Sequence, residues 1–308
     1  MIIGHRKQWE FLKKIAERKS FSHAYLFSGQ EKLGKRKIAL KWLSLLFQED
    51  LENSHHPDLS LISPLEPDSI PASAKAAAGK KALTGKREIQ IGQIRELIWK
   101  LSLKPYSAPL KAAVIDQAHL MNQEAQTSLL KTLEEPRGNA VLILISEHPE
   151  YLFSTILSRV QTVKFQPVER EEIKSYLKKQ GAPEKESEEI CQFSLGRPGL
   201  AIDFLSGSDK IKFQQQKIKD LIKISKSDLS ERFQYAKRLA EESKDLKEVL
   251  SVWLNYFRNI LFGGVENRGE YSLTKLSKIL KLIQNTNFLI STTNVNTKLA
   301  LENLVLEL

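Results

Sequence analysis

Short apolar runs alternate with amphipathic segments over the first 165 residues, and this alternation limits the fold more than any other feature. Four runs are almost continuously apolar, the second being the weakest: residues 24–27, 59–62, 112–115 and 141–145. Apolar residues recur at helical spacing over residues 35–48, 91–101 and 122–134. Apolar strands that alternate with helices are typical of a parallel sheet covered on both faces, so we predict an α/β domain.

The pattern changes after Pro167, where strand signals end. Residues 169–206 predict two or three short helices, with breaks where glycine and proline gather. From about residue 209 onward, apolar residues recur at helical spacing without any proline. We therefore predict an α/β domain over residues 1–166, a small helical domain over 167–207 and an all-helical domain over 208–308.

Positive charge is unevenly distributed along the chain. Lys and Arg number 47 against 37 Asp and Glu, a net charge of +10. Residues 1–41 hold 11 basic and 3 acidic residues, whereas residues 42–70 hold six acidic residues and no basic one. A basic, low-complexity insert at residues 75–87 predicts a surface loop of unassigned role. The charge suggests an acidic partner, although solvated helix faces plus a basic loop are the favoured explanation of any single cluster.

The sharpest motif is the run Gly29-Gln30-Glu31-Lys32-Leu33-Gly34-Lys35-Arg36, which follows a predicted strand and opens a predicted helix. In a phosphate loop of this spacing, Gly29 and Gly34 let backbone N–H groups face a phosphate, and Lys35 adds a positive charge. The next position should carry the Ser or Thr hydroxyl that holds Mg²⁺, but Arg36 cannot bind a cation. A glycine-bearing turn before a helix is the plainer alternative. We predict a phosphate loop that is not competent for hydrolysis.

A second motif follows the apolar run at residues 112–115, where Asp116 precedes Gln117. An acidic pair at the end of such a strand normally holds Mg²⁺ with one carboxylate and orients the attacking water with the next. Asp116 keeps the first role, but the amide of Gln117 cannot act as a general base at neutral pH. The two motifs have therefore each lost a group that magnesium-dependent hydrolysis requires.

These residues belong to a longer stretch that resembles the AAA+ clamp-loader family. After Asp116 the chain continues through Asn122 and Ala125 to Leu-Leu-Lys-Thr-Leu-Glu-Glu-Pro at residues 129–136, a phrase highly specific to these proteins. Further matches lie at residues 56–58, 93–97, 104–106 and 156–161. The resemblance is strong over about residues 4–206. It implies an AAA+ P-loop module over 1–166, a helical lid over 167–207 and a helical collar for oligomerisation over 208–308.

The resemblance also gives Arg159 a role that the residue alone does not define. In this family a Ser-Arg motif lies at a subunit boundary and presents its arginine to ATP held by the neighbouring subunit. A guanidinium there stabilises charge in the transition state. Taken alone, Arg159 is better explained as capping a helix or pairing with a carboxylate, and only the resemblance favours the role in trans. Ser158 would position the turn or cap a helix. The resemblance further implies a degenerate nucleotide site formed by Gly29, Gly34, Lys35 and Asp116.

Several positions depart from the family pattern. Residues 47–55 contain no cysteine, so we expect neither the family's four-cysteine zinc module nor another metal site, and the pair His55-His56 predicts a surface turn. Ser146-Glu147 stands where ATPase relatives place the Thr or Asn that senses the γ-phosphate. Gly199 holds the position of a second sensing arginine, and Arg197 lies two residues too early to replace it.

The function implied is that of a largely non-hydrolysing clamp-loader subunit. It would serve as the stator of a five-subunit assembly that loads a sliding clamp onto primed DNA in replication. Its partners would be the ATPase subunits, the delta subunit, the clamp and, through the assembly, DNA. No cofactor is required, although the retained glycines and lysine leave weak ATP binding open. An ATP-hydrolysing subunit and a stand-alone basic DNA-binding protein are the alternatives.

We expect a cytoplasmic protein that makes no membrane contact. No apolar run approaches the ~20 residues of a membrane span, and the first residues lack the apolar core of a signal peptide. Cys191 is the single cysteine, which excludes an internal disulfide.

Overall fold

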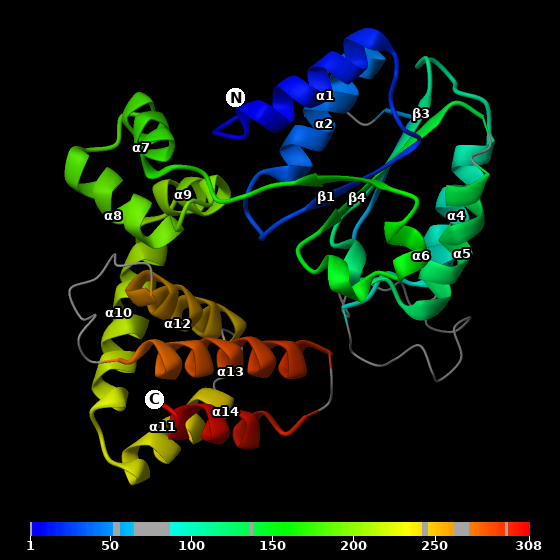
Figure 1. Ribbon diagram of the computed structural model, residues 1–308. Coiled ribbons are helices and arrows are strands. Elements are labelled where there is room, and N and C mark those ends of the chain that lie inside the picture. The colour runs from blue at the N-terminus through cyan, green and yellow to red at the C-terminus, as the bar shows by residue number, and fades with distance from the viewer. Residues whose placement is uncertain are drawn as a thin grey trace. The chain divides into compact units, whose positions relative to one another are not determined.

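The structure, a computed structural model, describes residues 2–51, 56–64, 87–135, 138–241, 246–261, 271–292 and 295–308 (Figure 1). The predicted basic insert lies outside these residues except for Arg87, as does His55. The chain separates into two compact units. Unit 1 comprises Met1–Ile173 and Gly196–Gly199, and unit 2 comprises Lys174–Leu195 and Leu200–Leu308. The predicted three-part division stays a prediction.

Within the described residues, unit 1 is built on one parallel sheet of five strands in the order β2-β3-β4-β1-β5 (Figure 1). The strands are β1 (Ala24–Ser28), β2 (Leu59–Ile62), β3 (Lys111–Ile115), β4 (Ala140–Ser146) and β5 (Gln161–Lys164). Four of them coincide with the predicted apolar runs. The predicted α/β fold class is therefore confirmed.

Strand β5 is the one that the sequence pattern did not predict. It lies at the edge of the sheet and pairs only with β1, from Gln161 beside Tyr25 to Lys164 beside Ser28. Val163 is its single buried residue. A strand with three exposed residues of four carries no apolar run, so hydropathy alone cannot detect it.

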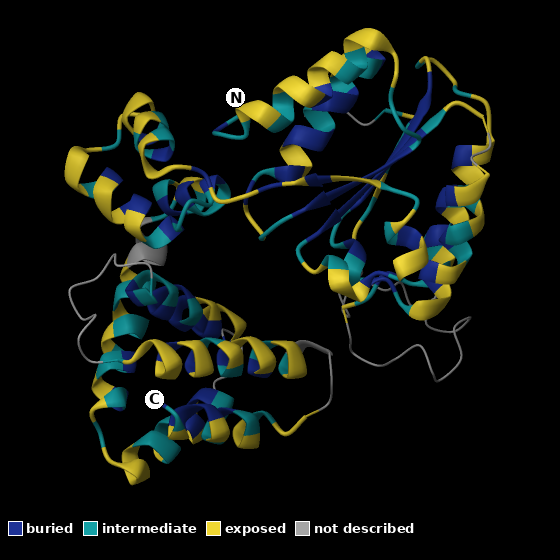
Figure 2. Ribbon diagram, in the orientation of Figure 1, coloured by how far each residue is buried: buried dark blue, intermediate teal, exposed yellow. Residues whose placement is uncertain are grey.

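Helices cover both faces of the sheet. Successive residues of a strand point to opposite faces, so each strand packs against both layers of helices. On one face, Tyr25 and Phe27 belong to an apolar cluster with α1 (Arg6–Arg18) and α2 (Lys35–Phe47). On the other face, Ala24 and Leu26 belong to a cluster with α4 (Ile91–Ser102), α5 (Gln123–Glu134) and α6 (Ser154–Leu157). Figure 2 shows the buried strands between these helical layers. This sheet fixes where every β–α connection of unit 1 emerges.

Helix α5 begins one residue later than the predicted span of 122–134. The side-chain oxygen of Asn122 accepts the backbone N–H of Ala125 at 2.8 Å, so Asn122 caps the helix from outside.

A buried ion pair anchors the loop between α4 and β3. The carboxylate of Asp58 has no exposed surface, lies 3.1 Å from Lys111 Nζ and accepts backbone N–H groups of Tyr106, Ser107 and Ala108 at 2.8–3.0 Å. Burial alone would raise the pKa of this carboxyl, but the three N–H groups and Lys111 hold it well below its usual value. Asp58 is thus a fully satisfied charged group in the interior of unit 1.

The regular elements of unit 2 are helices in all of its described residues. Helices α7 (Arg170–Lys179) and α9 (Pro198–Leu205) cross the unit boundary. The others are α8 (Glu184–Ser194), α10 (Ser208–Ser225), α11 (Leu229–Glu241), α12 (Leu246–Leu261), α13 (Leu273–Thr292) and α14 (Thr297–Leu306). Trp253 and Phe257 of α12 are fully buried in an apolar cluster that includes residues of α10, α11, α13 and α14. Across the described residues, no helix has both the length and the apolar character needed to cross a membrane.

We predict that Asp58→Ala lowers the free energy of unfolding by about 3–5 kcal/mol, because it leaves the Lys111 charge and three N–H groups without their acceptor. Glu96→Ala is the matched control, since it removes the carboxylate of an exposed pair that lies 2.8 Å from Lys100 Nζ. The control should cost less than about 1 kcal/mol. Urea unfolding of each variant measures both effects, and equal costs would contradict the anchoring role.

Candidate functional site

The predicted phosphate loop connects β1 to α2 at the carboxyl edge of the sheet. Gly29 has a φ of 149°, and a Cβ built on it would lie 2.3 Å from the carbonyl oxygen of Phe165. Gly34, with a φ of 89°, caps α2. Only glycine fits the first position, and it is strongly favoured at the second. The two glycines therefore allow the turn by which the chain passes from β1 into α2.

Lys35 is buried and turned onto its own loop. Its Nζ donates to the carbonyl oxygen of Gly29 at 2.6 Å and to that of Gln30. Burial lowers the pKa of Lys35, while the charges of Glu147, Asp116 and Glu31 raise it. The ammonium group of this lysine is thus engaged by two carbonyl oxygens of its own loop.

Arg36 and Asp116 meet across the same edge of the sheet. The Arg36 Nη1 lies 3.7 Å from Asp116 Oδ2, and the other carboxylate oxygen accepts the backbone N–H of Gln117 at 3.0 Å. A guanidinium therefore lies beside the carboxylate that the sequence offers as a magnesium ligand. The described residues contain no cluster of three or more His, Cys, Asp or Glu suited to a metal ion.

His119 and Glu147 extend this edge. The two side chains are 3.6 Å apart (Nε2 to Oε1), and His119 Nδ1 lies 3.4 Å from Ser146 Oγ. Burial lowers the pKa of His119 to about 4, assisted by the charges of His148 and Lys35. His119 is therefore neutral at pH 7. The sequence places His119 in a motif but gives no sign of its contact with Glu147, because that contact depends on β3 lying beside β4 in the sheet.

Gly199 closes one side of the loop. Its N–H donates to the carbonyl oxygen of Lys32 at 2.8 Å, and a Cβ at this position would lie 2.8 Å from the same oxygen. No side chain, and so no sensing arginine, fits here without moving the backbone.

Arg159 lies apart from this group, just after α6. Its Nη1 donates to the carbonyl oxygen of Thr155 at 2.9 Å and to Ser158 Oγ at 3.1 Å, and its Nη2 lies 2.9 Å from Glu134 Oε1. Ser158 Oγ also donates to Thr155, 3.1 Å away. About a third of the Arg159 side chain remains exposed. Sequence reasoning missed Glu134 as its partner, because nothing in the sequence places the end of α5 beside α6.

The predicted site residues therefore form two groups. Gly29, Gly34, Lys35 and Asp116 meet around the loop, whereas Ser158 and Arg159 bind to each other, to Thr155 of α6 and to Glu134 of α5.

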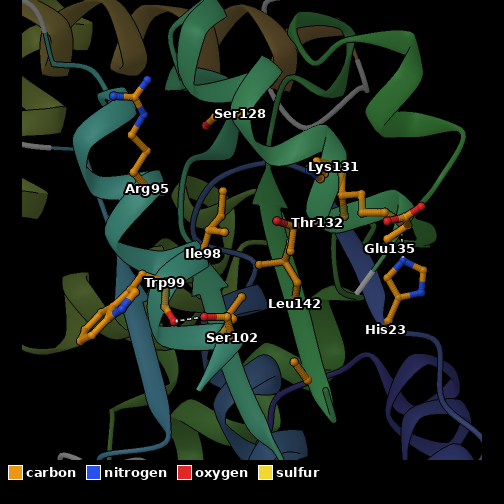
Figure 3. A pocket seen from close by; sticks show the side chains of 13 residues that line it. His23, Arg95, Ile98, Trp99, Ser102, Ser128, Lys131, Thr132, Glu135 and Leu142 are labelled. Atoms are coloured by element: carbon orange, nitrogen blue, oxygen red, sulfur yellow. Dashed lines mark hydrogen bonds between the residues drawn. The ribbon is translucent and has the colours of Figure 1, made fainter. Parts of the chain in front are cut away.

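A pocket of about 360 Å³ lies between α4 and α5, lined by residues that include Ile98, Trp99, Leu133 and Leu142 (Figure 3). His23 and Ala140 also line it, and they lie at the amino ends of β1 and β4. The pocket is thus at the edge of the sheet opposite the phosphate loop, and none of the predicted site residues lines it.

The parallel sheet, the loop between β1 and α2 and the acidic residue after β3 together define a protein of the P-loop class. A solved structure of a gamma subunit-related protein from Thermotoga maritima has this fold. It matches with a TM-score of 0.50 and 19% identity over 97% of each chain.

A family model described as "DNA polymerase III, delta subunit" matches residues 4–169, more than half of the chain. The chain therefore belongs to this family of clamp-loader subunits, which confirms the resemblance found in the sequence. Among curated relatives, the delta' subunit of Bacillus subtilis is 33% identical over 175 residues, which is 52% of this chain and 47% of the relative. The delta' subunit of Pseudomonas aeruginosa is 30% identical over 161 residues, 47% and 44% of the two chains. These matches span about half the length of the relatives.

We predict that acid destabilises the fold through His119. Its pKa is about 4 in the folded chain and about 6.5 when unfolded, so the unfolded chain binds the proton first as the pH falls. The stabilisation is fully present above pH 6.5 and is lost between pH 6.5 and 4, a change of about 3 kcal/mol. Urea unfolding between pH 7 and 4 should show a shallower pH dependence for His119→Gln than for the unmodified chain. Parallel curves would contradict this.

Proposed function

We propose that the chain is a non-hydrolysing stator subunit of a clamp loader and supplies Arg159 to an ATP site on a neighbouring subunit. The observation that carries the proposal is the Arg36–Asp116 contact, because it puts a cationic side chain beside the one carboxylate left to hold Mg²⁺. Neither a hydroxyl at position 36 nor an acid at position 117 is present. The chain's own loop thus lacks the groups of an ATPase.

The surroundings of Arg159 support action in trans. The Arg159 Nη1 donates to Thr155 and Ser158 at the end of α6, and its Nη2 pairs with Glu134 at the end of α5. Arginine has five N–H donors and cannot lose its charge at neutral pH, so this anchored and partly exposed group can still donate to a phosphate. Ser158 is a positioning residue here, since its hydroxyl contacts both Arg159 and Thr155.

The wider setting follows from the relatives. Curated relatives include a tau subunit of DNA polymerase III from Bacillus subtilis, 24% identical over 84% of this chain and 49% of the relative. We propose that subunits of this kind are the ATPase partners, with a delta subunit, a sliding clamp and primed DNA completing the assembly in the cytoplasm. The chain requires no cofactor of its own in this role.

We predict that Arg159→Ala, in an assembly reconstituted with its ATPase subunits, lowers turnover at the adjoining ATP site by on the order of 10³-fold, the usual contribution of an arginine finger. The total ATP turnover of the assembly falls by the fraction that this one site contributes. Steady-state ATP hydrolysis measures the loss, and Lys35→Ala should change it little.

Arg6→Ala is the matched control, because Arg6 is an exposed arginine of the same unit that lies 3.7 Å from Glu172. Its assembly should hydrolyse ATP at the unmodified rate. If the Arg159→Ala assembly does the same, Arg159 has no role in trans.

A further inference from the structure

The register of the sheet brings Glu147 to the mouth of the phosphate loop. Strands β1 and β4 pair in parallel with Ser28 beside Ser146, and the Gly29 N–H donates to the Ser146 carbonyl at 3.1 Å. The residues that follow both strands therefore leave the sheet side by side. Glu147 is the first of them on β4, and the loop residues are the first on β1.

Loop groups that would bind a phosphate are directed at acceptors within the chain instead. Burial raises the pKa of the Glu147 carboxyl, while the backbone N–H of Glu31 lowers it by donating to the carboxylate, and His119 Nε2 lies 3.6 Å from the carboxylate. Burial lowers the pKa of Lys35, the cation of the loop, and the Glu147 charge raises it. Lys35 also donates to two loop carbonyl oxygens. The side chain of Glu147 is about two-thirds buried. Burial and the Glu31 charge raise the pKa of Glu147, so the carboxylate is not favoured for its charge alone, but it lies among a loop N–H and the loop lysine, the kinds of group that face a phosphate in a phosphate loop.

A second carboxylate adds to the negative charge at this place. Glu31 belongs to the loop itself, and its charge acts on Glu147 strongly enough to raise the pKa of that carboxyl further, after burial. Asp116 lies at the same edge and also acts on Lys35. An incoming polyphosphate would meet these like charges, with Lys35 already engaged.

We propose that Glu147 is the specificity-determining residue of the loop: its carboxylate takes the anion position and excludes phosphate groups, so that this chain binds no nucleotide. The inference deepens the proposed function, because it explains how the chain keeps a phosphate loop without a nucleotide. It concerns only the chain's own loop and is tested without partners. Its failure therefore leaves the role of Arg159 in trans untouched.

The test is calorimetric titration of the isolated full chain with ATP and with inorganic pyrophosphate, each with and without Mg²⁺. The unmodified chain should bind neither ligand at millimolar concentration. Glu147→Gln keeps the size and polarity of the side chain but removes its charge, and should bind both ligands at least tenfold more tightly. Glu147→Thr should behave in the same way and covers the case in which the glutamine variant does not fold. Adding Lys35→Ala to Glu147→Gln should abolish the gain, which places the ligand in the loop.

Glu150→Gln is the matched control. Glu150 lies three residues further on and carries the same charge, but its carboxylate lies 2.9 Å from His148 Nδ1 at the surface. This variant should bind no better than the unmodified chain. Equal affinity of the unmodified and Glu147→Gln chains, whether both bind or neither does, would overturn the proposal. A gain from Glu150→Gln as large as that from Glu147→Gln would also overturn it.

Discussion

The parallel pairing of β1 with β4 is the constraint on which unit 1 depends. It places Ser28 beside Ser146, and one further hydrogen bond, from Gly29 to Ser146, carries the pairing into the loop. On the other side of β1, β5 leads to Phe165, whose carbonyl oxygen leaves no room for a Cβ at Gly29. The path of the loop is thus set by backbone contacts within the sheet. The loop can therefore keep this path whichever side chains stand at positions 36 and 117.

Much of the fold could be predicted because burial on both faces leaves a direct mark on sequence. The interior strands β1, β3 and β4 must be apolar at nearly every position, and each appears as an apolar run. Strand β5 obeys no such requirement, since only Val163 faces the core, and backbone pairing to β1 alone makes it a strand. Hydropathy cannot detect a strand that forms through backbone hydrogen bonds to a neighbouring strand rather than through burial of its own side chains.

The same distinction applies to the site. The loop glycines, Lys35, Asp116 and Arg159 could be predicted because motifs mark them along the chain. Their partners could not, because each partner is brought in by tertiary structure. Glu134 reaches Arg159 from another helix, and Arg36 reaches Asp116 across 80 residues of sequence. A motif therefore tells which groups are present, and only the fold tells which of them are already engaged.

Asp58 fixes the backbone of the loop at residues 106–108 through contacts that do not depend on which side chains the loop carries. Its carboxylate binds the backbone of residues 106–108, and every residue type except proline offers the same N–H group. Tyr106 is 86% exposed, so its backbone N–H rather than its ring holds the loop to Asp58. The side chains that this loop exposes can therefore be exchanged while the contacts that fix its backbone stay in place.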